Sequence, residues 1–152
     1  MTTYPPQISN AIHASRRADW ILVMSSLLLS IQIMRPTASM DQRAYEILMI
    51  WATEATWGSI IFALACAHIA ALLINGGKGW TPYLRAAVNH TCALLYLTIA
   101  AGFWTVNDSS TAVPIYASVG LAYFFCGCWA VQDAVRKVLE KKAVAHGKPR
   151  PA

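Results

Sequence analysis

Three long stretches of this chain carry almost no charged side chains, and they limit the folds that are open to it. They cover residues 55–74, 84–104 and 112–132, and each is close to the 20 residues that a helix needs to cross a bilayer. Hydrophobic residues make up 57% of the chain and charged residues only 12%, which is far from the composition of a soluble domain. We therefore expect an all-α integral membrane protein with one membrane domain over residues 1–152.

A shorter apolar run near the N-terminus predicts a fourth transmembrane helix. Trp20 to Met34 is uncharged but short, so a span over residues 18–34 requires local thinning of the bilayer or snorkelling by the flanking arginines. A cleaved signal peptide is the alternative, but no typical cleavage site follows the run. We favour an uncleaved span.

The distribution of basic residues predicts the orientation. Ten of the twelve lysines and arginines fall before the first span, in the connection between the second and third, or after the last. Only Arg35 and Arg43 fall on the other side. Because positive charges stay in the cytoplasm, we expect both termini there, with a cytoplasmic segment over residues 1–17 and a basic tail over residues 133–152.

The region before the second span predicts an extension. Ser39 and Gln42 match a capping box, and no helix-breaking residue follows before Asn75. A helix of about 35 residues would be longer than the bilayer core is thick. We therefore expect residues 40–54 to project outward or to lie in the interface, with Glu54 at the membrane surface.

The segment "INGGKGWTPYLRAA" at residues 74–87 could be a phosphate-binding loop or a turn. A phosphate-binding loop needs an upstream glycine and a hydroxyl residue after its Gly-Lys pair, but Leu72 and Gly79 occupy these positions. A turn is the better interpretation, because glycines end a helix and Pro82 suits the first turn of the next. We expect a cytoplasmic hairpin made by Asn75, Gly76, Gly77, Lys78, Gly79, Pro82 and Arg85.

Two histidines flank this hairpin symmetrically. His68 and His90 are each eleven residues from Gly79, so we expect them at the same depth on neighbouring helices. A cysteine two residues from each points away from the shared face, which argues against a zinc site. The histidines are weak candidates for binding a cofactor, but hydrogen bonds to each other, to neighbouring side chains or to the backbone are the favoured interpretation. We expect no metal and no cofactor, and no disulfide among the four cysteines, because all of them fall within spans.

Small residues recur at every fourth position in two of the spans. Such rows allow close helix packing in lipid, and we expect them to support self-association as well as packing within the chain. The row residues are Ser59, Ala63, Ala67 and Ala71 in the second span, and Ser118, Ala122, Cys126 and Ala130 in the fourth.

Catalysis and active transport have little support in the sequence. The chain shows no nucleophile with an adjacent base and no pair of catalytic carboxylates. We expect no Asp, Glu, Lys or Arg deep in a span, whereas pumps usually need such residues. The basic tail favours attraction to anionic lipid over nucleic-acid binding. We therefore expect a protein that is not an enzyme and does not bind nucleic acid.

The run "AHIAALLINGGKGWTPYLRAA", together with the later "AGFW", "NDSSTA" and "QDAVRK", resembles a group of small membrane proteins encoded by tailed bacteriophages. The resemblance covers about residues 67–137 and is most specific in the hairpin. Most members have no assigned function, and we transfer no functional residue from them. The resemblance implies a phage origin and a location in the inner membrane of the bacterial host.

Three hypotheses about function remain open. The first is a holin-like protein that oligomerises and permeabilises the host membrane for lysis, although four spans exceed the one to three that holins usually have. The second is a membrane interaction protein that excludes superinfecting phage without forming a pore, with residues 40–54 as its contact surface. The third is a small haem or quinone redox subunit that uses His68 and His90. The expected partners are the lipid bilayer, further copies of the chain, and a phage or host membrane protein.

Overall fold

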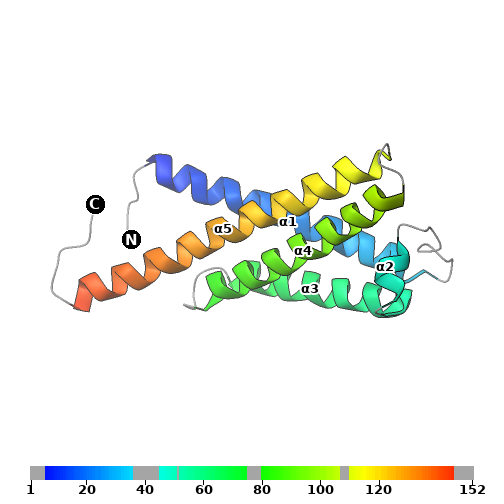
Figure 1. Cartoon of the computed structure of the whole chain (residues 1–152). Helices are drawn as coiled ribbons and strands as arrows, with labels where there is room; N and C mark the ends of the chain where they lie inside the picture. The colour runs from blue at the N-terminus through cyan, green and yellow to red at the C-terminus, as the bar shows by residue number, and fades with distance from the viewer. Residues whose placement is uncertain (1–5, 36–44, 51, 75–79, 107–109, 146–152) are drawn as a thin grey trace.

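The computed structural model describes residues 6–35, 45–50, 52–74, 80–106 and 110–145, and these residues fold into helices with no strand among them (Figure 1). The predicted all-α class is therefore confirmed for this part of the chain. The helices are α1 (Pro6–Ile33), α2 (Glu46–Met49), α3 (Glu54–Ile74), α4 (Thr81–Val106) and α5 (Ala112–Ala145).

The four long helices run alternately in opposite directions along one bundle (Figure 1). The start of α1, the end of α3, the start of α4 and the end of α5 lie at the same end of the bundle. The short helix α2 lies at the opposite end, where it contacts α4. We call these the hairpin end and the α2 end.

Three helices are long and apolar enough to cross a membrane. They are Glu54–Ile74, Thr81–Val106 and the Ala112–Leu139 part of α5. Three of the four predicted spans are thereby supported by length and composition. Helix α1, which covers the predicted span 18–34 except its last residue, is not among them. The paired arginines and the aspartate in its middle are charged residues that lower its apolar character.

The helix boundaries differ from the predicted spans mainly in α1, which begins at Pro6, and in α5. Helix α4 begins at Thr81, and the Trp80 carbonyl accepts hydrogen bonds from the amides of Tyr83 and Leu84. The last helix continues past the predicted span end at residue 132 to Ala145, so the first part of the basic segment 133–152 is helical. The hairpin residues Asn75, Gly76, Gly77, Lys78 and Gly79 lie outside the described residues.

The predicted continuous helix before the second span is wrong. Helix α2 ends at Met49 and α3 begins afresh at Glu54. Thr53 starts the new helix, because its carbonyl accepts from the amide of Trp57 at 3.0 Å and its hydroxyl accepts from the amide of Thr56 at 3.3 Å. A capping threonine therefore starts α3, and the expected capping box at Ser39 and Gln42 lies outside the described residues.

The segment before α3 does not simply project outward. The hydroxyl of Tyr45 lies 3.1 Å from that of Tyr116 on α5, and its ring meets Phe103 on α4 edge to face at 5.3 Å. Burial, together with the hydrogen bond to Tyr116, raises the pKa of Tyr45, so this phenol stays protonated. Tyr45 thus packs onto the α2 end of the bundle.

The small-residue rows divide between the interior and the surface. Ala71, Cys126 and Ala130 are buried within the chain, and Ala67 and Ala122 are partly buried. The remaining members are exposed, namely Ser59, Ala63 and Ser118. Packing inside one chain therefore uses two of the four row residues in α3 and three of the four in α5.

Glycines that the sequence analysis did not single out bring α4 and α5 close together. A Cβ atom added at Gly127 would lie 2.5 Å from the imidazole ring of His90, and one added at Gly120 would lie 2.9 Å from Cγ of Leu97. Any larger residue at these positions would push the two helices apart. Helix α4 accordingly makes its most extensive contact with α5.

Candidate functional site

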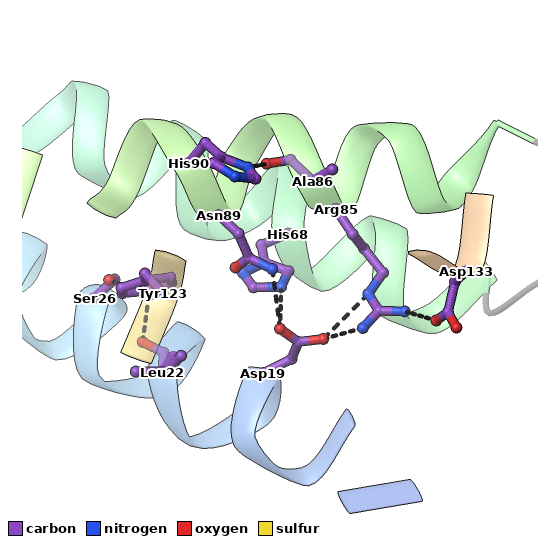
Figure 2. Close-up of polar contacts among 10 residues, drawn as sticks. All are labelled: Asp19, Leu22, Ser26, His68, Arg85, Ala86, Asn89, His90, Tyr123 and Asp133. Carbon is purple, nitrogen blue, oxygen red and sulfur yellow. Dashed lines mark hydrogen bonds and ion pairs between the residues drawn. The ribbon is translucent and has the colours of Figure 1, made fainter. Parts of the chain in front are cut away.

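A buried carboxylate lies at the centre of a polar cluster inside the bundle (Figure 2). Asp19 on α1 is 0% exposed. Its Oδ2 accepts hydrogen bonds from Nη2 of Arg85 and, at 3.1 Å, from Nε of Arg85. Its Oδ1 accepts from Nδ2 of Asn89 at 3.1 Å. Two residues one helical turn apart on α4 therefore hold one carboxylate of α1.

The same arginine also reaches the last helix. Nη1 of Arg85 lies 3.6 Å from Oδ2 of Asp133 on α5, and the Asp133 side chain is 22% exposed. A guanidinium presents its donors as a rigid planar fork, so it can serve two carboxylates at once. Arg85 thus links α1, α4 and α5 through charge.

His68 brings α3 into the cluster. Its Nε2 lies 3.6 Å from Oδ1 of Asp19, and the side chain is 1% exposed. Among the described residues, both ring nitrogens of His68 and Oδ1 of Asn89 are buried without a hydrogen-bond partner. Residues from α3 and α4 therefore meet at Asp19 of α1, and Asp133 of α5 joins them through Arg85. We call Asp19, His68, Arg85, Asn89 and Asp133 the Asp19 cluster.

A second polar group lies deeper in the bundle (Figure 2). The Tyr123 hydroxyl donates to the carbonyl of Leu22 at 2.6 Å and lies 2.6 Å from the hydroxyl of Ser26. Because the single proton of Tyr123 goes to Leu22, Ser26 donates to Tyr123 and accepts from Tyr96 at 3.1 Å. The rings of Tyr96 and Tyr123 stack at 5.6 Å. This group ties α1 to α4 and α5 a second time.

The two histidines singled out from the sequence do not meet. Nδ1 of His90 donates to the carbonyl of Ala86 at 2.7 Å, and the ring packs edge to face on Phe124 of α5 at 5.6 Å. His68 instead faces Asp19 and the ring of Tyr123, at a centroid distance of 6.4 Å. The two histidines, which the sequence analysis offered as weak candidates for binding a cofactor, therefore do not face each other across a shared site.

Arg85, which was predicted as a residue of the hairpin, is buried against Asp19 in the first turns of α4. Asp19 and Arg85 are charged residues within the predicted spans 18–34 and 84–104, but each is the second residue of its span and not deep in it. The sequence carried the signal, because in an antiparallel bundle the predicted spans that begin with these two residues start at the same end.

Other predicted site residues lie around the cluster without joining it. Pro82 is buried in the first turn of α4. Cys126, which was predicted for helix packing, is buried and close to Asp19. Within the described part of the chain, no three His, Cys, Asp or Glu side chains are placed to hold a metal ion.

The cluster supplies charge pairing inside an apolar bundle. A buried carboxylate without its partner is expensive, and removing one member of such a pair typically costs about 3–5 kcal/mol. The arrangement can hold α1 at one depth and one rotation against the other three helices.

Comparison with protein-family models, with characterised proteins and with solved structures finds no match to this chain. Its function has to be inferred from the bundle, from the Asp19 cluster and from the surface that the bundle presents.

Proposed function

We propose that this chain is a phage-encoded protein of the host inner membrane with four spans and both termini in the cytoplasm. It acts in a holin-like manner, in that copies associate in the bilayer and permeabilise it. The exposed row of small residues on α3 is the observation that carries this proposal.

The alternating helix directions and the Asp19 cluster support α1 as the fourth span. Asp19 can remain charged inside the bundle because Arg85 compensates it. Beyond Asp19, α1 turns large apolar side chains outward, and Ile21 is 68% exposed. Lipid is the environment that suits such a surface. With α1 inserted, most basic residues gather at the hairpin end, which makes that end cytoplasmic.

The outer face of α3 supports association between copies. Small residues at spacings of four and three are exposed along the helix, where none of the described helices covers them. In a bilayer, small residues let helix backbones approach closely, and dispersion contacts then favour association. The exposed residues are Ala55, Ser59, Ala63, Cys66 and Ala70, which we call the α3 row.

A native cysteine allows a direct test of this contact. Cys66 is exposed within the α3 row, whereas Cys92 and Cys126 are buried. We expect oxidation or a short bis-maleimide to cross-link the chain into dimers in native membranes, and Cys66→Ala to abolish the dimer. Cys128→Ala is the matched control and should leave the dimer intact. A dimer that survives Cys66→Ala, or none at all, would remove the α3 row as the contact surface.

Lysis needs a separate experiment. Inducible expression should collapse the membrane potential and then lower culture density. Ser59→Leu with Ala63→Leu should delay or prevent this, because the bulkier residues hold neighbouring copies apart. Ala87→Leu, at an exposed alanine of α4, is the matched control and should lyse like the native chain. Unchanged potential and density at high expression of the native chain would sink the holin-like proposal.

The α2 end favours one second candidate. Ile50 is 80% exposed and Met49 is also exposed, and both lie just beyond the bundle on the side away from most basic residues. An exposed apolar tip suits a contact with another membrane protein, as superinfection exclusion would require. Expressing cells should then resist a related phage without losing membrane potential. Met49→Ser with Ile50→Ser should abolish resistance, while Glu46→Gln, an exposed change on the same short helix, should not.

A further inference from the structure

The apolar surface of α5 continues past residue 132, where the predicted span ends. Large apolar side chains are exposed at spacings of four, three and one, which places them on one face of the helix. They are Val131, Val135, Val138 and Leu139, which we call the α5 stripe. Leu139, at its far end, is 60% exposed. The described helices of the chain leave the whole stripe uncovered.

The length of this surface places its end at the level of the lipid headgroups. The apolar part of α5 has 28 residues and α3 has 21. At about 1.5 Å per residue, these correspond to about 42 Å and about 32 Å. A bilayer has a hydrocarbon core of about 30 Å and measures about 40–45 Å with its headgroups. Helix α3 therefore matches the core, whereas α5 runs on past the ends of α3 and α4 at the hairpin end (Figure 1).

The same part of α5 is basic. Four of the ten residues 136–145 are lysine or arginine, and one is acidic. Arg136 and Lys137 are partly exposed and lie off the stripe on the same helical turn. A helix with an apolar face and basic residues beside it suits a membrane interface, because its apolar side chains enter the acyl region. Long basic side chains meanwhile extend their charges to the headgroups.

A second copy of the chain and anionic lipid are the two occupants to compare. Two α5 ends side by side would bring like charges together, which disfavours a second copy. An anionic headgroup supplies the opposite charge, and its acyl chains can cover the stripe. The stripe also continues the outward face of α5 on which Phe124 is exposed, and lipid borders that face in the inserted bundle. These features favour anionic lipid.

We propose that residues 131–142 of α5 bind anionic phospholipid in the leaflet at the hairpin end. Acyl chains cover the α5 stripe, and Arg136 and Lys137 contact the phosphate groups. The composition of the basic tail alone predicts attraction to the membrane surface through charge, and the exposed stripe adds an apolar contact that enters the bilayer. The inference rests on the proposed insertion of the bundle in a membrane, but not on lysis or on self-association.

A fluorescent label on the stripe reports what covers it. Cys66→Ala with Cys128→Ala removes the two cysteines that are not buried. Leu139→Cys, or Val131→Cys as the matched position inside the span, then carries a nitrobenzoxadiazole label. The full chain is placed as one copy in nanodiscs of phosphatidylcholine, with or without phosphatidylglycerol. Quenching by acrylamide, which is uncharged and stays in water, measures the exposure of each label.

The two positions should respond differently to lipid charge. We expect the label at position 131 to be shielded in both kinds of nanodisc. The label at position 139 should be quenched severalfold less with phosphatidylglycerol than without it, because the anionic headgroups hold the basic side chains at the interface. Arg136→Gln with Lys137→Gln should remove this dependence. Arg136→Lys with Lys137→Arg keeps both charges and should preserve it.

The label at position 131 separates the possible failures. Strong quenching at position 139 in both lipids would overturn the proposal, because water would then cover the stripe. Shielding that is equal in both lipids, or that persists in the glutamine variant, would also overturn it, because the cover would not depend on anionic lipid. Strong quenching at position 131 would contradict the insertion of the bundle itself. With position 131 shielded in every variant, a failure at position 139 concerns the end of α5 alone.

Discussion

The two ends of the bundle are closed by different chemistry. At the hairpin end, side chains from α3 and α4 contact the buried Asp19 of α1, and Asp133 of α5 joins them through Arg85. At the α2 end, the ring of Tyr116 stacks on that of Phe103 at 5.6 Å, and its hydroxyl lies within hydrogen-bond distance of the hydroxyl of Tyr45, just before α2. The first end depends on charge and the second on aromatic surface.

This difference shows how a membrane bundle fixes the position of its helices. In lipid, apolar burial discriminates weakly between arrangements, because the surroundings are as apolar as the core. Aromatic contacts tolerate small shifts of one helix along another. A buried ion pair does not, since both charges become costly once they separate. We therefore expect the hairpin end to set the depth of α1. We expect the α2 end to tolerate substitutions with a smaller loss of stability.

The largest effect is expected from breaking the ion pair on one side. Asp19→Leu leaves Arg85 buried with only the partly exposed Asp133, and Arg85→Leu leaves Asp19 buried without a counter-charge. Each single variant should lose about 3–5 kcal/mol of the free energy of unfolding. Unfolding in mixed micelles with increasing SDS measures the loss.

The double variant sharpens this prediction. Asp19→Leu with Arg85→Leu removes both charges, and apolar replacement of a buried pair is often close to neutral. We expect the double variant to be more stable than either single variant. Additive losses would show that the two residues contribute through separate contacts and not as a pair.

The next largest effect concerns the close approach of α4 and α5. Gly127→Ala places a methyl group where the His90 ring lies, so the helices must separate or the ring must turn. Overpacking of this kind costs typically about 1–3 kcal/mol, measured by the same unfolding experiment. Adding His90→Ala should restore most of the loss, because it removes the clash. A cost that is unchanged by His90→Ala would contradict the contact.

Most of the architecture could be predicted from the sequence, because charge-free stretches of spanning length have few other uses. The rotation of each helix about its own axis could not be predicted from the sequence. Helix α3 is apolar on nearly all sides, so nothing in its pattern tells which side faces inward. His68 and His90 were therefore paired by symmetry of position, whereas the structure turns them toward α1 and α5.

The Asp19 cluster was within reach of the sequence but was missed. Asp19 lies inside the predicted span 18–34 and Arg85 inside the predicted span 84–104, and antiparallel packing places both at the hairpin end. Two opposite charges at one depth predict an ion pair. His68 and Asn89 could not be added in the same way, because their inclusion depends on helix rotation.

A smaller loss is expected at the second polar group of the interior. Tyr123→Phe removes the hydroxyl that donates to the carbonyl of Leu22 and accepts from Ser26. A buried hydrogen bond contributes about 0.5–1.5 kcal/mol net, and this hydroxyl takes part in two. We expect a loss of roughly 1–2 kcal/mol in SDS unfolding, because Ser26 can turn its proton elsewhere. Ser26→Ala in the Tyr123→Phe background should add little, and a large further loss would show that Ser26 acts independently.

The smallest effect is expected at the α2 end. Tyr45→Phe removes one hydroxyl that bonds to Tyr116 but keeps the ring against Phe103. Polar contacts between membrane helices average about 0.6 kcal/mol, so the loss should be near that value. Tyr45→Ala should cost more, because it also removes the aromatic contact of about 0.5–1.5 kcal/mol. If Tyr45→Phe destabilised the protein as much as Asp19→Leu, the two ends would fix the positions of the helices equally strongly. The depth of α1 would then be set by the whole length of the bundle and not by the Asp19 cluster.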